Sequence, residues 1–220
     1  MTPPPAAPAP GRSRRRLARW RRSWILALAL AAAAPALPAR EVEIGLVGGV
    51  QQTGGIATRA GDLGIDAGPL YGLRVAWRVR PDGLIEVAWA HETARAHGDL
   101  DTGPARFDVT FDALEIGGIW ETRPGKMRPF LGLSLGTTRV AGPDQGTGEG
   151  WNFSGSISGG ARWLLGEHAV AHVEVRGSGI LFAEGGALGC GFSGGGACSV
   201  AVSGSLLGAL SVRAGLAARF

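Results

Sequence analysis

The feature that most constrains the fold of this chain is a repeated alternation of apolar residues with small or polar ones. A period of two places successive side chains on opposite faces of a β-strand, whereas a helix needs a period of about 3.6. In the last segment, Leu210, Val212, Ala214, Leu216, Ala218 and Phe220 alternate with Ala209, Ser211, Arg213, Gly215, Ala217 and Arg219. The alternation predicts an all-β protein.

Eight segments alternate in this way. They cover approximately residues 42–50, 71–80, 85–90, 114–121, 131–136, 153–163, 171–176 and 209–220. Before the fourth segment, Phe107, Val109 and Phe111 occupy odd-numbered positions, whereas Leu114 occupies an even-numbered one. A β-bulge near residues 112–113 is therefore predicted, because it would bring all of these apolar residues to one face.

The connections between the segments alternate strictly between tight and long. The tight ones, at 81–83, 123–126 and 166–168, have turn chemistry or come close to it. The long ones are glycine-rich and cover approximately residues 53–70, 95–105, 141–150 and 180–199. We expect an eight-stranded antiparallel up-and-down β-barrel with both termini at the short-turn end.

Such a barrel is either a soluble ligand carrier with an apolar interior or a transmembrane barrel with an apolar exterior. The polar face consists mostly of Gly, Ala and Ser, with charged residues among them. Small side chains fit the narrow interior of an eight-stranded barrel. The aromatic residues also fall into two groups, as in the interfacial girdles of membrane barrels. They are Trp77, Trp120, Trp163 and Phe220 near the short turns, and Tyr71, Phe107, Phe111, Trp151 and Phe153 near the long loops. We therefore predict a transmembrane barrel with short periplasmic turns and long extracellular loops.

Residues 1–39 have the pattern of a secretory signal peptide. Seven arginines and no acidic residue precede an apolar run at 24–34, and small residues and prolines follow it. The run is shorter than the roughly 20 residues that a spanning helix needs, which disfavours an uncleaved anchor. We expect cleavage after Ala36 or Ala39, export, and a barrel domain over residues 40–220.

The charge balance excludes a nucleic-acid partner once this segment is removed. The whole chain has 22 basic and 18 acidic residues and a net charge of +4. Without the seven arginines of residues 1–39, 15 basic residues face 18 acidic ones, and the net charge becomes −3. The basic character therefore belongs to the export segment.

Three stretches resemble the small eight-stranded outer-membrane barrels of the OmpA/OmpX transmembrane-domain type. They are "RPFLGLSLG" at 128–136, "GGARWLLGEHAVAHVEVRG" at 159–177 and the terminal "AGLAARF". The resemblance implies a monomer in the outer membrane, with outer-membrane lipid and the assembly machinery as its partners. It also implies that the terminal Phe220 is part of the signal that this machinery reads.

Alternation places eight charged residues on the inward face: Arg74, Arg78, Glu86, Glu115, Arg162, Glu174, Arg176 and Arg213. Because an unpaired buried charge is costly, each must find a partner or water. These charges could line a selective pore or a gated plug. A salt-bridged, non-conducting interior is favoured because eight strands leave little free lumen.

Cys190 and Cys198 are the only cysteines and both fall in the last long connection. In an exported protein this predicts a disulfide, since the chain has no further Cys or nearby His to complete a metal site. We expect no metal and no cofactor.

The leading functional hypothesis is a non-enzymatic outer-membrane protein that stabilises the envelope or presents adhesive loops. A narrow porin-like channel for small solutes is the alternative. A lipid-modifying enzyme at the outer rim is a third, with His91, Glu92 and His97 as the residues available to it. It is disfavoured because the local motifs of such enzymes are absent.

Overall fold

The protein is described by a computed structural model over residues 41–58, 61–100, 103–122, 125–142, 150–182, 187–191, 197–201 and 206–220. Within these ranges the chain forms β-strands and no helix. The strands are β1 (Val42–Thr53), β2 (Ile56–Thr58), β3 (Gly61–Ile65), β4 (Gly68–Arg80), β5 (Gly83–Leu100), β6 (Gly103–Glu121), β7 (Met127–Ala141), β8 (Gly150–Leu164), β9 (Ala169–Leu181), β10 (Ala187–Gly191), β11 (Ala197–Ala201) and β12 (Leu206–Arg219).

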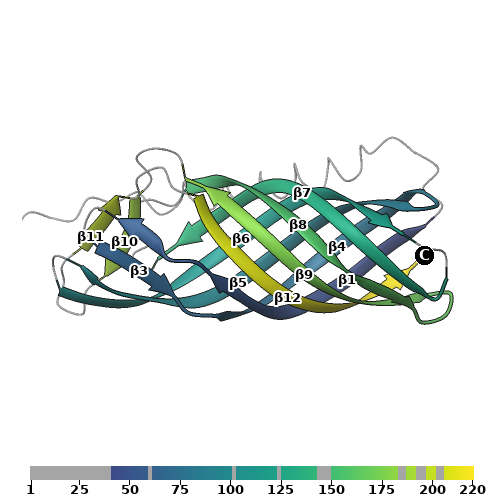
Figure 1. Cartoon of the computed structure of the whole chain (residues 1–220), viewed down its shortest axis with the longest axis horizontal. Helices are drawn as coiled ribbons and strands as arrows, with labels where there is room; N and C mark the ends of the chain where they lie inside the picture. Colours follow the sequence, from purple (N-terminus) through teal and green to yellow (C-terminus); the bar gives the residue numbers. More distant parts are fainter. Residues whose placement is uncertain are drawn as a thin grey trace, which may run out of the picture. The chain divides into compact units, whose positions relative to one another are not determined.

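Eight of the strands close into an antiparallel barrel in the order β1, β4, β5, β6, β7, β8, β9 and β12 (Figure 1). The last strand pairs with the first, from Glu43 opposite Arg219 to Thr53 opposite Ala209. Closure extends to the final residue, because Phe220 N donates to Val42 O at 2.9 Å and Val42 N donates to Phe220 O at 3.1 Å. The predicted eight-stranded up-and-down barrel is confirmed.

The two ends of the barrel differ. We call the end with the short connections β4–β5, β6–β7 and β8–β9 the turn end and the opposite end the loop end, where β3, β10 and β11 lie in Figure 1. Two connections predicted as loops contain hairpins, β2–β3 and β10–β11, and β3 also pairs with β5. The predicted long loop at 95–105 is wrong, because β5 and β6 stay paired as far as Leu100 opposite Gly103. Alternation continues there through inward Ala94 and Ala96, which supports an extended hairpin.

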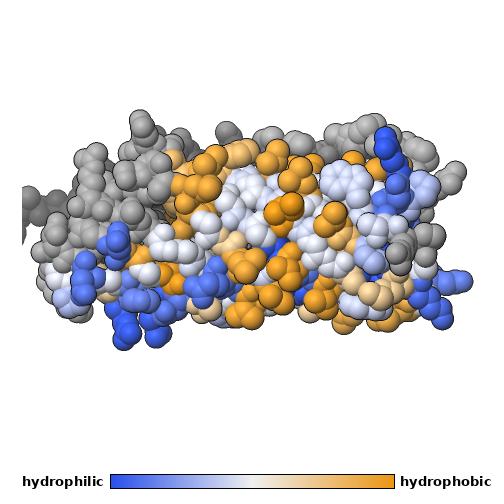
Figure 2. All heavy atoms as spheres, viewed as in Figure 1, coloured by the Kyte–Doolittle hydropathy of each residue, from blue (hydrophilic) through white to orange (hydrophobic). Residues whose placement is uncertain are grey.

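The outer face of the barrel carries the apolar half of the alternation. Large exposed hydrophobic side chains occur on every strand of the barrel, among them Leu46, Leu73, Ile116, Leu133, Ile157, Val175 and Leu216. On the face drawn in Figure 2, hydrophobic residues gather along the middle of the barrel and hydrophilic ones lie mainly toward its ends. A contiguous apolar belt on a closed barrel is the surface that lipid requires.

The predicted bulge at residues 112–113 is wrong. The pairing of β5 with β6 runs without a register shift, and the side chains of Phe107 and Phe111 are 9% and 3% exposed. Both aromatics therefore point into the barrel and do not belong to the outer girdle. Polar Asp108 takes the outward position between them, because β6 extends beyond the apolar belt at its loop end.

The predicted signal peptide, residues 1–39, lies outside the described residues. Within the described ranges, no helix is long and apolar enough to cross a membrane.

Candidate functional site in the barrel interior

All eight charged residues that alternation assigns to the interior are buried, at 9% exposure or less. Their side chains project from β4, β5, β6, β8, β9 and β12 into a space too narrow for bulk water. The structure divides them between two groups at different heights.

The first group, the central charge layer, consists of Arg74, Glu86, Glu115, Glu174, Arg176 and Arg213. Arg176 lies at its centre and contacts three carboxylates: Glu115 Oε2 at 2.7 Å from Nη1, Glu86 Oε1 at 3.2 Å from Nη2, and Glu174 Oε1 at 3.2 Å from Nε. Arg74 Nη2 lies 2.7 Å from the second oxygen of Glu86. Three arginines thus balance three glutamates, which offsets much of the cost of burying them.

Hydroxyl groups complete the central charge layer. Ser134 and Ser156 donate to Glu115 Oε2 at 3.0 and 3.1 Å, and Arg213 Nε donates to Ser211 Oγ at 2.9 Å. Ser134 of β7 and Ser156 of β8 are opposite each other in the register, and both reach the same carboxylate.

The second group, the turn-end charge layer, consists of Glu41, Glu43, Arg78, Glu121, Arg128, Arg162 and Arg219. Arg162, whose side chain is 0% exposed, forms ion pairs with both Glu43 and Glu121. Arg78 bridges Glu121 at 2.9 Å and Glu41 at 2.7 Å. The apolar residues Ala76, Leu84, Ile119 and Phe130 form a small cluster between the two layers.

The remaining contacts of the turn-end charge layer tie the chain end to this network. Arg128 Nη1 lies 2.9 Å from Glu121 Oε2, and Arg219 Nη1 lies 2.7 Å from Glu41 Oε1. Sequence reasoning did not include Glu43 and Glu121 in the network, although alternation placed both on the polar face. Their role depends on which strands face each other across the barrel, and no local pattern encodes that.

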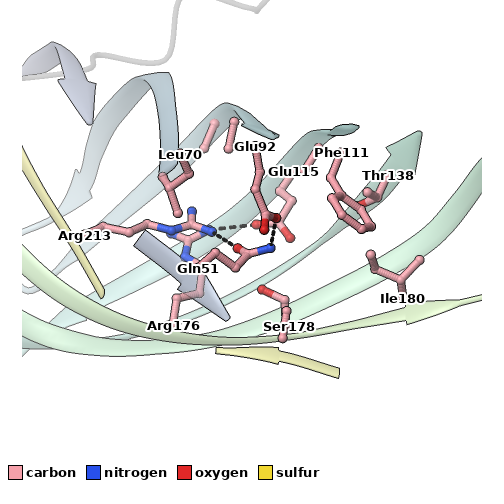
Figure 3. Close-up of a pocket in the computed structure, with 14 residues that line it drawn as sticks. Gln51, Leu70, Glu92, Phe111, Glu115, Thr138, Arg176, Ser178, Ile180 and Arg213 are labelled. Carbon is pink, nitrogen blue, oxygen red and sulfur yellow. Dashed lines mark hydrogen bonds and ion pairs between the residues drawn. The ribbon is translucent and has the colours of Figure 1, made fainter. Parts of the chain in front are cut away.

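A cavity of about 40 Å³ lies on the loop-end side of the central charge layer. Gln51 spans it, since its amide donates to Glu92 and its carbonyl accepts from Arg213 Nη2 at 3.3 Å (Figure 3). Thr53 donates to the other oxygen of Glu92 at 3.4 Å. A cavity of this size has room for about three water molecules.

An apolar cluster lies in the interior on the loop-end side of this cavity. Its members are Leu63, Ile65, Ala94, Ala96, Ala105, Phe107, Val109, Phe111, Val140, Ile180, Phe182 and Leu207. Leu63 and Ile65 of β3 belong to it, so the β2–β3 hairpin contributes side chains to this cluster. Among the described residues, the interior is thus a stack of two charge layers, a small cavity and an apolar cluster.

The fold resembles solved outer-membrane proteins. The outer membrane protein OprG from Pseudomonas aeruginosa matches with a TM-score of 0.55 and 14% sequence identity, over 82% of this chain and 95% of OprG. Neisserial surface protein A matches with a TM-score of 0.51 and 12% identity, over 82% of this chain and 97% of that one. This chain has the fold of the small eight-stranded outer-membrane β-barrels. No sequence-family profile and no curated protein sequence matches it.

Two other predicted sites lie at the ends of this outer-membrane barrel fold. The backbone register places Cys190 of β10 opposite Cys198 of β11, whereas the predicted disulfide itself lies outside the described residues, as do both side chains. At the turn end, Phe220 completes the pairing of β1 with β12 and leaves its ring exposed. No group of three or more His, Cys, Asp or Glu side chains that could hold a metal occurs in the described ranges.

The rim residues considered for an enzyme do not act as one group. Glu92 points into the barrel and is buried, so it does not face His91. His97 Nδ1 lies 3.5 Å from Asp66 Oδ1 in an exposed pair further along β5. The partner of His91 is Asp112 of β6, which sequence reasoning did not identify.

Proposed function

We propose that this chain is an integral protein of a Gram-negative outer membrane with a structural role, in which the barrel anchors loop-end hairpins at the cell surface and conducts no solute. The observation that supports this most strongly is the central charge layer. Arg176 holds carboxylates from β5, β6 and β9 together, so its guanidinium occupies the axis along which a solute would pass.

Opening such a layer is energetically costly. Moving Arg176 aside would leave Glu115, Glu174 and Glu86 short of a partner in a narrow interior, and uncompensated buried charges cost several kcal/mol. The turn-end charge layer repeats this obstacle nearer the turns, because Arg162 is held between Glu43 and Glu121.

The porin-like alternative is disfavoured by the volume of the interior cavities. The one beside Gln51 measures about 40 Å³, and two others next to Arg176 measure about 10 Å³ each. Spaces of this size hold individual water molecules rather than a hydrated ion or a sugar.

A deletion strain tests the structural role. We expect loss of the protein to increase sensitivity to detergents and large antibiotics, and full-length protein to restore resistance. We also expect a variant without the β10–β11 hairpin to restore it, since that hairpin lies outside the barrel wall. Unchanged sensitivity after deletion would argue against an envelope-stabilising role, and failure of the hairpin variant alone would assign the role to the loops.

A further inference from the structure

The outer face of the barrel carries a side-chain arrangement that the interior does not explain. His91 of β5 and Asp112 of β6 are directly opposite each other in the antiparallel register, and His91 Nδ1 lies 2.7 Å from Asp112 Oδ1. Thr93 is two residues beyond His91 on the same face, and its Oγ1 lies 3.4 Å from His91 Nε2. Hydroxyl, imidazole and carboxylate thus follow one another in a chain of contacts.

This order of groups is the one that activates a hydroxyl nucleophile. A carboxylate that accepts the Nδ1 proton orients the imidazole and leaves Nε2 free to take the proton of the hydroxyl. The same carboxylate stabilises the imidazolium that forms. Asp112 can serve this purpose because Arg139 Nη1, 4.0 Å from its second oxygen, helps to hold it in place.

The height of the group on the barrel indicates its substrate. On the turn-end side, Leu114 and Ile116 of β6 belong to the exposed apolar belt, whereas on the loop-end side the outward residues are Arg95 and Asp108. The group therefore lies at the boundary between acyl chains and headgroups, where membrane lipids carry their ester carbonyls.

Two aromatic rings lie beside the imidazole of His91, in positions to pack against the acyl chain of a lipid substrate. The ring of Tyr71 lies 5.1 Å from that of His91, and the ring of Trp89 lies 6.3 Å from it, measured between centroids. Tyr71 and Trp89 also contact each other edge to face at 6.1 Å. The imidazole thus has an apolar wall on the side of the lipid.

We propose that Thr93, His91 and Asp112 form a catalytic site that hydrolyses acyl esters of outer-leaflet lipids. Thr93 Oγ1 attacks the ester carbonyl while its proton passes to His91 Nε2. The tetrahedral intermediate collapses to an acyl-Thr93 ester, and the lipid alkoxide leaves with the proton from His91. Water then attacks the acyl ester and gives a proton to His91, which returns it to Thr93 as the fatty acid leaves. The net reaction consumes one ester and one water and releases one alcohol and one acid.

Arg95 is suited to stabilise the charge that develops on the carbonyl oxygen. It lies two residues beyond Thr93 on the same face of β5, and its exposed guanidinium is 3.6 Å from Asp108. A positive charge aimed at a developing oxyanion supplies a large part of the acceleration in acyl transfer.

This activity rests on the outer-membrane location proposed above, but it does not depend on a closed interior, because the site lies on the opposite face of the wall. Purified full-length protein in vesicles of phosphatidylethanolamine and lipopolysaccharide tests it, with released fatty acid measured by mass spectrometry. Thr93→Val, His91→Gln and Asp112→Asn should each reduce release by a factor on the order of 100 or more. Thr93→Ser should retain activity, since it keeps the hydroxyl.

His97→Gln is the matched control, because His97 pairs with Asp66 on the same outer face without a hydroxyl partner in the described contacts. It should match the unmodified protein. The difference in gel mobility between unheated and boiled samples reports barrel insertion separately, so a failure to insert is distinguished from a failure to hydrolyse. Inserted protein that releases no fatty acid from either lipid, or equal release by Thr93→Val, overturns the proposal. The lipid that loses its acyl chain identifies the substrate.

Discussion

Arg176 Nη1 lies 2.7 Å from Glu115 Oε2, although the two residues are 61 positions apart in the sequence. The contact joins β9 to β6 through the interior, so it links strands that are not neighbours in the barrel wall. Wall pairing holds each strand to its neighbours, and contacts of this kind fix the cross-section. The charge layers are thus an internal framework for the barrel.

Replacing Arg176 with Met should destabilise the barrel strongly. The change leaves Glu115 and Glu174 buried without this cation, and breaking a buried ion network by removing one partner costs about 3–5 kcal/mol. Urea unfolding in detergent micelles, followed by tryptophan fluorescence, measures the free energy. Arg95→Ala breaks an exposed pair and should cost at most about 1 kcal/mol. Equal midpoints for the two variants would show that the central charge layer contributes no more to stability than an exposed ion pair.

Gly215→Ala should also destabilise the barrel, for a steric reason. A Cβ at this position would lie 2.3 Å from Cε1 of the His172 ring and 2.4 Å from the carbonyl oxygen of Leu46. The backbone contact cannot give way, so the expected cost is about 1–3 kcal/mol. Gly208→Ala on the same strand is the control, because a Cβ there meets nothing within 4 Å. If both variants unfold at the same urea concentration, the interior is looser around His172 than the structure indicates.

Phe220→Ala should impair assembly in cells more than folding in vitro. The substitution keeps the backbone hydrogen bonds to Val42 and removes a ring that is 75% exposed. The ring therefore contributes little to packing within the protein. If the insertion machinery recognises this ring, its loss should lower the amount of protein in the outer membrane. Leu216→Ala removes a similarly exposed side chain from the same strand and should leave the amount unchanged. Equal losses would indicate a general effect of lipid-facing area.

The predicted disulfide between Cys190 and Cys198 can be tested on protein purified from the outer membrane, by intact mass with and without reduction. We expect the oxidised form, two hydrogens lighter, because the register places the two residues opposite each other. On the chain-entropy model, a bridge over so short a loop stabilises by about 2–3 kcal/mol. Protease should cleave the loop end of the double variant Cys190→Ser/Cys198→Ser faster than that of the unmodified protein, because the variant lacks this stabilisation. Two free thiols in the periplasmically exported protein would refute the prediction.

The sequence predicted the barrel well because strand number, alternation and turn length are local properties. Residues such as Leu133 and Ile157 alternate with small residues, and the structure places them on the outer face. The inward position of Glu115 follows from the same rule.

The prediction from sequence was wrong where the apolar residues of a strand point into the barrel instead of toward lipid. Alternation gives all apolar residues of a strand one orientation, and it therefore assigns Phe107 and Phe111 to the lipid face. In the structure β6 continues beyond the apolar belt, where apolar residues point inward and Asp108 faces outward. Alternation alone does not mark the height at which the environment changes from lipid to water. The contact of His91 with Asp112 was missed for a related reason, since it depends on the register between β5 and β6.

Single-channel recording in planar lipid bilayers tests most directly whether the interior of this membrane barrel is closed. Purified, heat-modifiable protein should insert without producing conductance steps across a range of voltages, because the ion pairs of Arg176 and Arg162 cross the interior. Reproducible, step-like conductance from the unmodified protein would show that the interior is open.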